Sequence, residues 1–307
     1  MRIGRGVSVG PYCVIGGNVV LGDGVQLDSH VRITGHTTVG AGSVVHAFAT
    51  LGALPQDLKY AGEPSYLVVG NRCRIAEHAL LSGGTAGGGG LTWIGDGCFV
   101  MSQCHIAHDC VLGRDVVLAS NSALAGHVHV ADGARISGFA CVQQRVNVGG
   151  GAFVGGGSVL AHDLIPHGLA VGNRAQLVSI NVRGLRRHHA PPAELRALLS
   201  SYRYIFDVPA QGYYAPLPLP PLSTLRERAE CILGDDTASQ HTRVRELIAF
   251  VLGRRSVALP AGSSRDHAYA AAGAAAASTQ CDRALCLPPT GTHNQQRNRV
   301  GVPWNET

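Results

Sequence analysis

The residues best suited to do chemistry lie in one short segment, His105-Ile106-Ala107-His108-Asp109. An imidazole next to a carboxylate is a common form of general base, because the carboxylate orients the ring and stabilises its charged state. His108 is therefore the strongest candidate for a base, with Asp109 as its support. The chain has 15 histidines, and any single one taken alone is more simply explained as an exposed corner residue.

A spacing of 18 residues links His108 to other candidates further along the chain. The column that starts at His108 continues through Gly126, Gln144 and His162. His127 is one residue away from this column, and His105 falls on the same turn as His108. If the chain completes one turn every 18 residues, these side chains gather on one face.

A six-residue repeat would produce such columns. Aliphatic residues recur every sixth position from Ile3 to Leu51 and again, over twelve consecutive hexads, from Ile94 to Leu160. One hexad can form a short strand and a corner, and three hexads make a coil that must stack on its neighbours at about 4.8 Å. Glycine often follows the aliphatic residue, as at Gly4 and Gly22, and we expect it to supply the permissive backbone of the corner. The sequence thus predicts a mainly β fold, a parallel β-helix over residues 1–165.

Two interruptions of the repeat, 53–68 and 85–93, are expected to leave the helix as loops, and long loops on a rigid scaffold often carry function. Residues 166–190 are expected to form a connector, and residues 191–260 a small α-helical C-terminal domain. Its helices should run from Ala193 to Phe206, from a cap at Ser223 to Leu233, and from a cap at Ser239 to Leu252. The composition of residues 261–307 predicts disorder.

The bulk composition narrows the function classes. The net charge of +5 is mildly basic, which suits an acidic partner and does not imply nucleic acid. The nine cysteines are odd in number and form no CxxC pair, which favours reduced thiols and a cytoplasmic protein. No apolar run reaches about 18 residues, and the N-terminus lacks the apolar region of a signal peptide, so no membrane insertion is expected.

Three cysteines near the candidate base, Cys98, Cys104 and Cys110, could be mistaken for metal ligands. All three occupy the inward small position of the hexad, whereas the corner histidines point elsewhere. We expect no metal site, and buried thiols that act as small hydrophobic residues.

Four segments resemble the acyl carrier protein-dependent UDP-N-acetylglucosamine O-acyltransferases of lipid A biosynthesis, which belong to the hexapeptide-repeat acyltransferases. They are the loop Gln56-Asp57-Leu58-Lys59-Tyr60-Ala61-Gly62-Glu63-Pro64, Gly88-Gly89-Gly90-Leu91-Thr92, His105-Ile106-Ala107-His108-Asp109-Cys110 and Leu124-Ala125-Gly126-His127-Val128. The resemblance covers roughly Gly10 to Phe206. It implies a left-handed helix and a homotrimer with sites between subunits. It also implies no bound cofactor, because the acyl donor is the phosphopantetheine thioester of acyl carrier protein.

The resemblance also implies a reaction and roles for its residues. A 3-hydroxyacyl chain would pass from the carrier protein to the 3-hydroxyl of UDP-N-acetylglucosamine, the first step of lipid A biosynthesis. His108 would be the general base, Asp109 its support, and the Gly126 N–H a donor to the thioester oxyanion. The implied substrate-binding residues are Gln56, Asp57, Lys59, His105, His127, Gln144, Gly156, Asn181 and Arg187.

Three of these roles are more specific. Asp57 and Lys59 would hold hydroxyl groups of the sugar and of the acyl chain from the loop. Asn181 and Arg187 would contact the phosphate end of the nucleotide. Gly156, expected to point inward, matches the position that limits acyl length, so a glycine there predicts room for a long chain.

The sequence departs from the family pattern at Ser82, Gln143, Arg145, Arg183 and His188. These positions are peripheral to the base, so we expect activity with a raised KM. The basic run from Arg183 to His189 either docks the acidic carrier protein or is a solvated turn. Alternatives that remain open are N-acyl transfer to an amino sugar, a zinc hydratase with a histidine trio across a subunit interface, and a non-catalytic relative.

Overall fold

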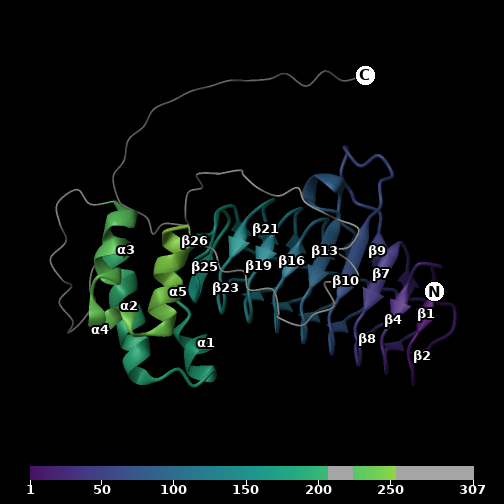
Figure 1. Cartoon of the computed structure of the whole chain (residues 1–307), viewed down its shortest axis with the longest axis horizontal. Helices are drawn as coiled ribbons and strands as arrows, with labels where there is room; N and C mark the ends of the chain where they lie inside the picture. Colours follow the sequence, from purple (N-terminus) through teal and green to yellow (C-terminus); the bar gives the residue numbers. More distant parts are fainter. Residues whose placement is uncertain (207–223, 254–307) are drawn as a thin grey trace, which may run out of the picture.

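A computed structural model of the chain describes residues 1–206 and 224–253. The hexads form a three-sided stack of short parallel strands that begins at the N-terminus, and a group of helices lies at the opposite end (Figure 1). No helix in these two described ranges is long and apolar enough to cross a membrane.

Each side of the stack is one sheet, and neighbouring strands of a sheet come from successive coils of the chain. The first sheet contains β1 Arg2–Ile3, β4 Val20–Leu21, β7 His36–Val39, β10 Tyr66–Val69, β13 Leu91–Ile94, β16 Val111–Leu112, β19 His129–Val130 and β22 Asn147–Val148. The second contains β2 Ser8–Val9, β5 Gln26–Leu27, β8 Val44–Val45, β11 Arg74–Ile75, β14 Phe99–Val100, β17 Val117–Leu118, β20 Arg135–Ile136, β23 Phe153–Val154, β25 Gly168–Val171 and β26 Gln176–Ile180. The third contains β3 Val14–Ile15, β6 Arg32–Ile33, β9 Thr50–Ala53, β12 Leu80–Ser82, β15 His105–Ile106, β18 Ala123–Leu124, β21 Cys141–Val142 and β24 Val159–Leu160.

The strand register confirms the 18-residue coil around the candidate base. In the third sheet Ile106 pairs with Leu124, and Leu124 pairs with Val142. The side chains of these three residues point inward and are almost fully excluded from solvent. Equivalent corners of successive coils therefore lie directly above one another, which is what the column through His108 requires.

The three cysteines near the candidate base lie inside the prism, as predicted, whereas Cys141 in β21 is exposed. Cys98, Cys104 and Cys110 are buried, and each thiol donates a hydrogen bond to a carbonyl oxygen of the next coil, at 3.1, 3.1 and 3.2 Å. Burial raises the pKa of the Cys110 thiol to about 12, so it stays protonated. These thiols contribute to the core and do not face the corner histidines.

The role predicted for the glycine that follows the aliphatic residue is borne out at Gly52, with φ of 71°, but is wrong within the regular coils. The backbone of Gly22 and Gly40 is not left-handed; the left-handed residue comes two positions later, as at Gly24, with φ of 68°, and Gly42, with φ of 66°. What Gly22 provides is space, because a Cβ there would lie 2.7 Å from the backbone nitrogen of Ala41 in the next coil. Close stacking of coils, rather than backbone freedom, requires glycine at this position.

The two interruptions of the repeat leave the prism next to each other, between β9 and β10 and between β12 and β13 (Figure 1). The second contains a short 3-10 turn, η1, Ala86–Gly88. The connector that follows the repeats has more structure than predicted. β25 continues the second sheet in parallel with β23, β26 pairs antiparallel with β25, and α1, Val182–Arg187, follows.

The C-terminal helices are α2 Pro192–Phe206, α3 Leu225–Leu233, α4 Asp236–Ser239 and α5 Thr242–Val251. Thr224 caps α3 and forms a capping box with Glu227, whereas the predicted cap, Ser223, lies outside the described residues. The predicted cap at Ser239 is wrong, because this residue ends α4 and α5 begins after His241. Residues 261–307 also lie outside the described part of the chain.

Stability should depend on how deep a hexad lies in the stack. Ile136 and Ile3 occupy the same hexad position, but Ile136 is 1% exposed, whereas Ile3, in the first coil, is 51% exposed. We expect Ile136→Ala to lower the free energy of unfolding by about 2–5 kcal/mol, and Ile3→Ala by about 1 kcal/mol or less. Denaturant unfolding of both variants measures the difference. Equal losses of unfolding free energy would contradict the conclusion that the inner coils bury this position more deeply than the first coil.

Candidate active site

The candidate base and its carboxylate form a hydrogen-bonded pair in the corner that follows β15. His108 Nδ1 lies 2.7 Å from Asp109 Oδ2, and the two side chains are 6% and 1% exposed. Since an ionised carboxylate can only accept, the Nδ1–H of His108 donates to Asp109. The lone pair of a neutral ring is then on Nε2, which is the atom that can take a proton.

The carboxylate of Asp109 is held by two further donors, both from Thr85. The backbone N–H of Thr85 donates to Oδ1 and its hydroxyl donates to Oδ2, each at 2.7 Å. The backbone N–H of Asp109 in turn donates to Thr92 Oγ1 at 2.8 Å. The sequence analysis gave neither threonine a role, because the break in the repeat hides which residues at its two ends return to the corner.

Gly126 lies one coil further on and packs against the ring of His108. A Cβ at Gly126 would lie 2.5 Å from His108 Cε1 and 2.7 Å from Nε2, so no other residue fits without moving the imidazole. Among the described residues none accepts a hydrogen bond from the Gly126 N–H. This amide therefore remains able to donate to a ligand next to the base.

Two more histidines border the pair. The ring of His127 meets that of His108 edge-on, with centroids 5.1 Å apart, and its Nε2 lies 3.7 Å from Asp109 Oδ2. Burial lowers the pKa of His127, although Asp109 opposes the shift, and burial together with His108 lowers the pKa of His105. Both rings are thus mainly neutral near pH 7 and suited to hydrogen bonding.

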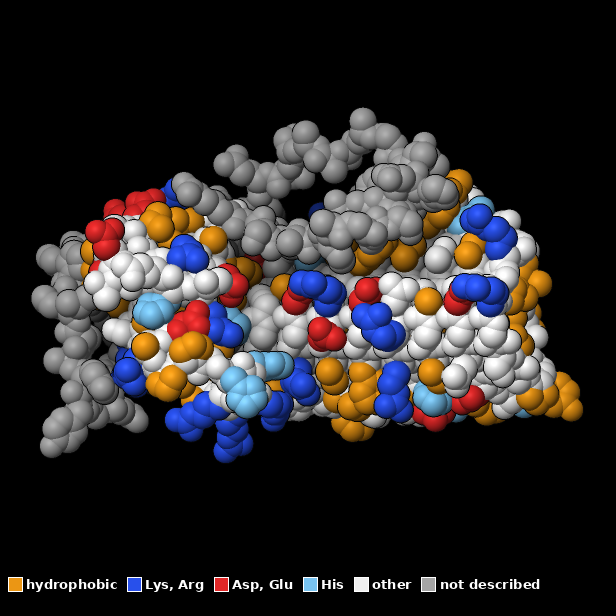
Figure 2. Space-filling model, turned by 60° about the horizontal axis from the view of Figure 1, so that its bottom comes forward, with side chains coloured by type: hydrophobic (Ala, Val, Ile, Leu, Met, Phe, Trp, Pro, Cys, Tyr) orange, Lys and Arg blue, Asp and Glu red, His pale blue; other side chains and the backbone are white. Residues whose placement is uncertain are grey.

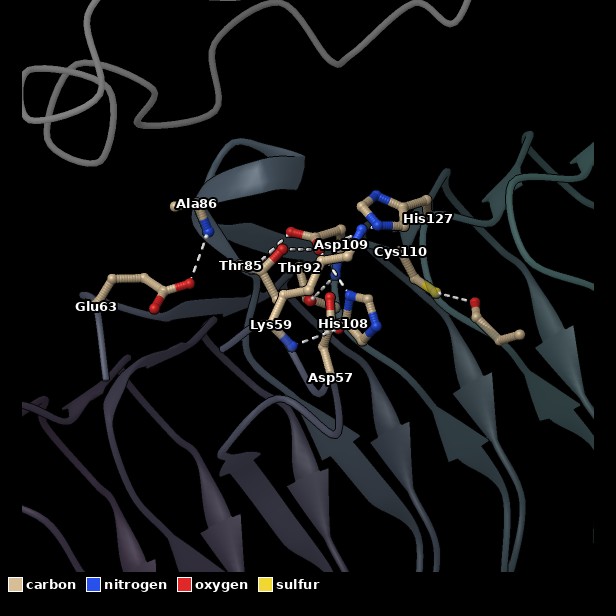
Figure 3. A network of polar contacts seen from close by, with 11 residues as sticks. Asp57, Lys59, Glu63, Thr85, Ala86, Thr92, His108, Asp109, Cys110 and His127 are labelled. Carbon is tan, nitrogen blue, oxygen red and sulfur yellow. Dashed lines mark hydrogen bonds and ion pairs between the residues drawn. The ribbon is translucent and has the colours of Figure 1, made fainter. Parts of the chain in front are cut away.

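The first loop brings Asp57 and Lys59 to the same side of the pair (Figure 3). The carboxylate of Asp57 accepts a hydrogen bond from the Lys59 N–H at 3.0 Å, and its charge tends to raise the pKa of His127. Gln56 and Lys59 are exposed, and so is Gln144 in the coil after Gly126. The structure therefore brings Asp57 and Lys59 of the loop close to the pair and to His127, while Gln56 and Gln144 are exposed in the neighbouring loop and coil.

Two predicted nucleotide contacts lie elsewhere in the chain. Asn181 caps α1 by accepting from the Gly184 N–H at 2.9 Å, and it donates to the Gly151 carbonyl oxygen at 3.1 Å. It lines a cavity of about 550 Å³ between the first sheet and α5, which His108 does not line. Arg187 is exposed on α1. One chain alone therefore does not unite these residues with the base.

The prediction that Gly156 points inward is wrong. It is exposed at a corner, where an added Cβ would lie 3.4 Å from the Gly138 carbonyl oxygen of the preceding coil. Of the positions that depart from the family pattern, Ser82 is fully buried, and its hydroxyl has no partner among the described residues. Gln143 and Arg145 are exposed.

His108, Asp109 and His127 form the one group of potential metal ligands found in the described residues. The carboxylate of Asp109 already accepts three hydrogen bonds, from His108 and twice from Thr85. An ion bound between the three side chains would have to compete with these donors. The geometry thus fits a hydrogen-bonded base better than a metal centre.

Known proteins resemble this chain over most of its length. The family model described as "Bacterial transferase hexapeptide (six repeats)" matches residues 1–35 and 91–126, and the model described as "Udp N-acetylglucosamine O-acyltransferase; Domain 2" matches residues 163–258. The acyl-[acyl-carrier-protein]–UDP-N-acetylglucosamine O-acyltransferase of a Sulfurovum species is 46% identical over 205 residues, which are 67% of this chain and 78% of the relative. The enzyme of the same name from Azorhizobium caulinodans is 42% identical over 73% of this chain and 80% of the relative.

Solved structures show the same relationship. A crystal structure of a UDP-N-acetylglucosamine acyltransferase matches with a TM-score of 0.74 and 35% identity, over 82% of this chain and 91% of that chain. The UDP-N-acetylglucosamine O-acyltransferase of Moraxella catarrhalis matches with a TM-score of 0.73 and 32% identity, over 82% of this chain and 92% of that chain. The likeness therefore spans the prism and the helices that follow it.

The lowered pKa of His105 should make stability depend on pH. Between the folded pKa and the unfolded value of 6.5, the unfolded chain binds more protons, so acidification through this window favours unfolding. We expect the melting temperature of the wild type to fall more between pH 7 and 5 than that of His105→Gln. His188→Gln, which removes an imidazole from an exposed position, serves as control. An equal or steeper fall in His105→Gln would show that burial of His105 does not disfavour its charged form.

Proposed function

Because the chain belongs to the acyl-[acyl-carrier-protein]–UDP-N-acetylglucosamine O-acyltransferase family, we propose that it performs the first step of lipid A biosynthesis in the cytoplasm. In this step a 3-hydroxyacyl chain passes from the phosphopantetheine thioester of acyl carrier protein to the 3-hydroxyl of UDP-N-acetylglucosamine. The observation that carries the proposal is the His108–Asp109 pair, at 2.7 Å, packed against Gly126.

The proposed mechanism uses these three residues. His108 Nε2 takes the proton of the sugar 3-hydroxyl while the oxygen attacks the thioester carbonyl carbon, and Asp109 stabilises the imidazolium that forms. The Gly126 N–H donates to the oxyanion of the tetrahedral intermediate. When the intermediate collapses, the carbon–sulfur bond breaks and the proton on His108 passes to the departing thiolate. His108 thus returns to its neutral state.

The residues around the pair are proposed to hold the substrates. Asp57 and Lys59 come from a loop beside the base, where they can bind hydroxyl groups of the sugar and of the acyl chain (Figure 3). His105 and His127 have lowered pKa values and can donate or accept as neutral rings. Gln56 and Gln144, both exposed, complete the proposed sugar-nucleotide site.

We propose that a neighbouring copy supplies the remaining contacts, as in a homotrimer with sites between subunits. Asn181 and Arg187 do not lie with His108 in one chain, and the cavity that Asn181 lines also contains the polar side chains of His129 and Asn147. A second chain that placed this surface opposite the base would bring the nucleotide-binding residues to it. Gly156, exposed at its corner, would then leave space for the acyl chain between subunits.

The basic surface of α1 is proposed to receive the acyl carrier protein. Arg183, Arg186 and Arg187 are exposed on this helix, and basic side chains and histidines gather where α1 lies (Figure 2). Such a surface would steer an acidic partner, and its contribution would weaken as ionic strength rises.

The purified wild-type protein should transfer a 3-hydroxyacyl chain from acyl carrier protein to UDP-N-acetylglucosamine. Because Gln143, Arg183 and His188 replace residues usual in the family, KM for the sugar nucleotide should be raised while transfer remains measurable at saturation. Mass spectrometry of the product should find an ester. Exclusive acylation of an amino-sugar acceptor would favour N-acyl transfer, and no product at saturating substrates would support a non-catalytic relative.

The contact between Gly126 and His108 gives a second prediction. Gly126→Ala should lower kcat by about 100-fold or more, because the new Cβ displaces the base. Gly17→Ala is the matched control, since Gly17 occupies the same corner position in the first full coil and an added Cβ there meets nothing within 4 Å. Initial rates of acyl transfer measure both variants. Equal activities for Gly126→Ala and Gly17→Ala would mean that the packing of His108 on Gly126 is unimportant for the reaction.

A further inference from the structure

The two loops that leave the prism are connected to each other and to the carboxylate of Asp109 (Figure 3). Thr85, at the start of the second loop, donates to both oxygens of Asp109. The next residue, Ala86, donates its N–H to Glu63 Oε1 in the first loop at 3.2 Å, while Glu63 Oε2 accepts from the Ala61 N–H at 2.9 Å. A continuous chain of contacts therefore runs from the loop that carries Asp57 to the proposed base.

The 3-10 turn η1 closes directly over the Asp109 carboxylate. A Cβ added at Gly88 would lie 2.1 Å from Asp109 Cγ and within 2.5 Å of both carboxylate oxygens. Thr85 and Asp109 are both buried as whole residues. Little water can reach this carboxylate, so the protein itself must supply its hydrogen-bond donors.

Thr85 also orients the carboxylate between two neighbouring histidines. Asp109 Oδ2 lies 2.7 Å from His108 Nδ1 and 3.7 Å from His127 Nε2, so two imidazoles compete for one oxygen. The Thr85 hydroxyl donates to this same oxygen, and the Thr85 N–H fixes the other. With both oxygens held, the carboxylate cannot turn towards His127.

We propose that Thr85 is a positioning residue for the reaction, which aligns His108 through Asp109 and is itself held by the Glu63 contact of the substrate loop. This inference rests on the proposed role of His108 as general base. The Gly-rich second loop would then do more than connect two coils. It donates hydrogen bonds to the Asp109 carboxylate through Thr85, and to Glu63 of the first loop through Ala86. Disturbing either end should reduce turnover more than substrate binding.

The test compares Thr85→Val, which keeps the shape but loses the hydroxyl, with Thr85→Ser, which keeps it. We expect kcat for acyl transfer to fall about tenfold in Thr85→Val, equivalent to about 1.4 kcal/mol, with KM for the sugar nucleotide changed less than twofold. Thr85→Ser should recover most of the loss. Thr37→Val removes an equally buried hydroxyl, bonded to the Thr34 carbonyl oxygen, and should leave kcat unchanged.

The pH profile separates alignment from simple loss of structure. The titratable or charged groups around Asp109 are His108, His127 and the Cys110 thiol, with His105, Asp57, Lys59 and Arg145 beyond them (Figure 3). Without the Thr85 hydroxyl, the carboxylate accepts one hydrogen bond fewer and attracts the protonated His108 ring more strongly. The acidic limb of the kcat/KM profile should therefore move to higher pH. A structural defect would lower the profile without moving this limb.

The outcomes are distinct. If wild type transfers acyl chains and Thr85→Val matches it in kcat and in pH profile, the positioning role is wrong and the proposed function stands. The same conclusion follows if Thr85→Ser is as impaired as Thr85→Val. If the wild type itself shows no transfer, the proposed function fails first.

Discussion

The hydrogen bonds between successive coils are the constraint on which the rest of the molecule depends. They fix the pairing of Ile106 with Leu124 and of Leu124 with Val142, so each corner stacks on the corner 18 residues away. A slip of one residue would turn the buried aliphatic residues outward, and the core therefore enforces the register. Gly126 lies on His108 only because this register is kept. The site is accordingly a property of the stack and not of the local segment around His108.

The corner itself imposes a second requirement. A carboxylate as buried as that of Asp109 would be costly without partners, and the three donors from His108 and Thr85 offset that cost. Supplying the two Thr85 donors takes a loop that leaves the prism and returns over the corner, which is what residues 83–90 do. The break in the repeat thus allows a loop to hold the Asp109 carboxylate in place beside the His108 imidazole.

Much of this arrangement could be predicted from the sequence, because the hexad period shows which residues of successive coils, 18 positions apart, lie next to each other. It placed His108, Gly126 and His127 together, and it placed the thiols of the core correctly. It could not show that Thr85 returns to Asp109, since periodicity says nothing about a segment outside the repeat. The inward orientation expected for Gly156 and the backbone role expected for Gly22 are wrong for a different reason, because both depend on the corner geometry and on the approach of a neighbouring coil.

The central claim is that the corner built by this register makes His108 the base of an acyl transfer. The most direct measurement is the rate of transfer from acyl carrier protein to UDP-N-acetylglucosamine by wild type and by His108→Ala, at saturating concentrations of both substrates. Loss of a general base predicts a kcat lower by about 10²–10⁴-fold, with the fold intact by circular dichroism. Equal rates for the two proteins would contradict the claim, whatever else the prism binds.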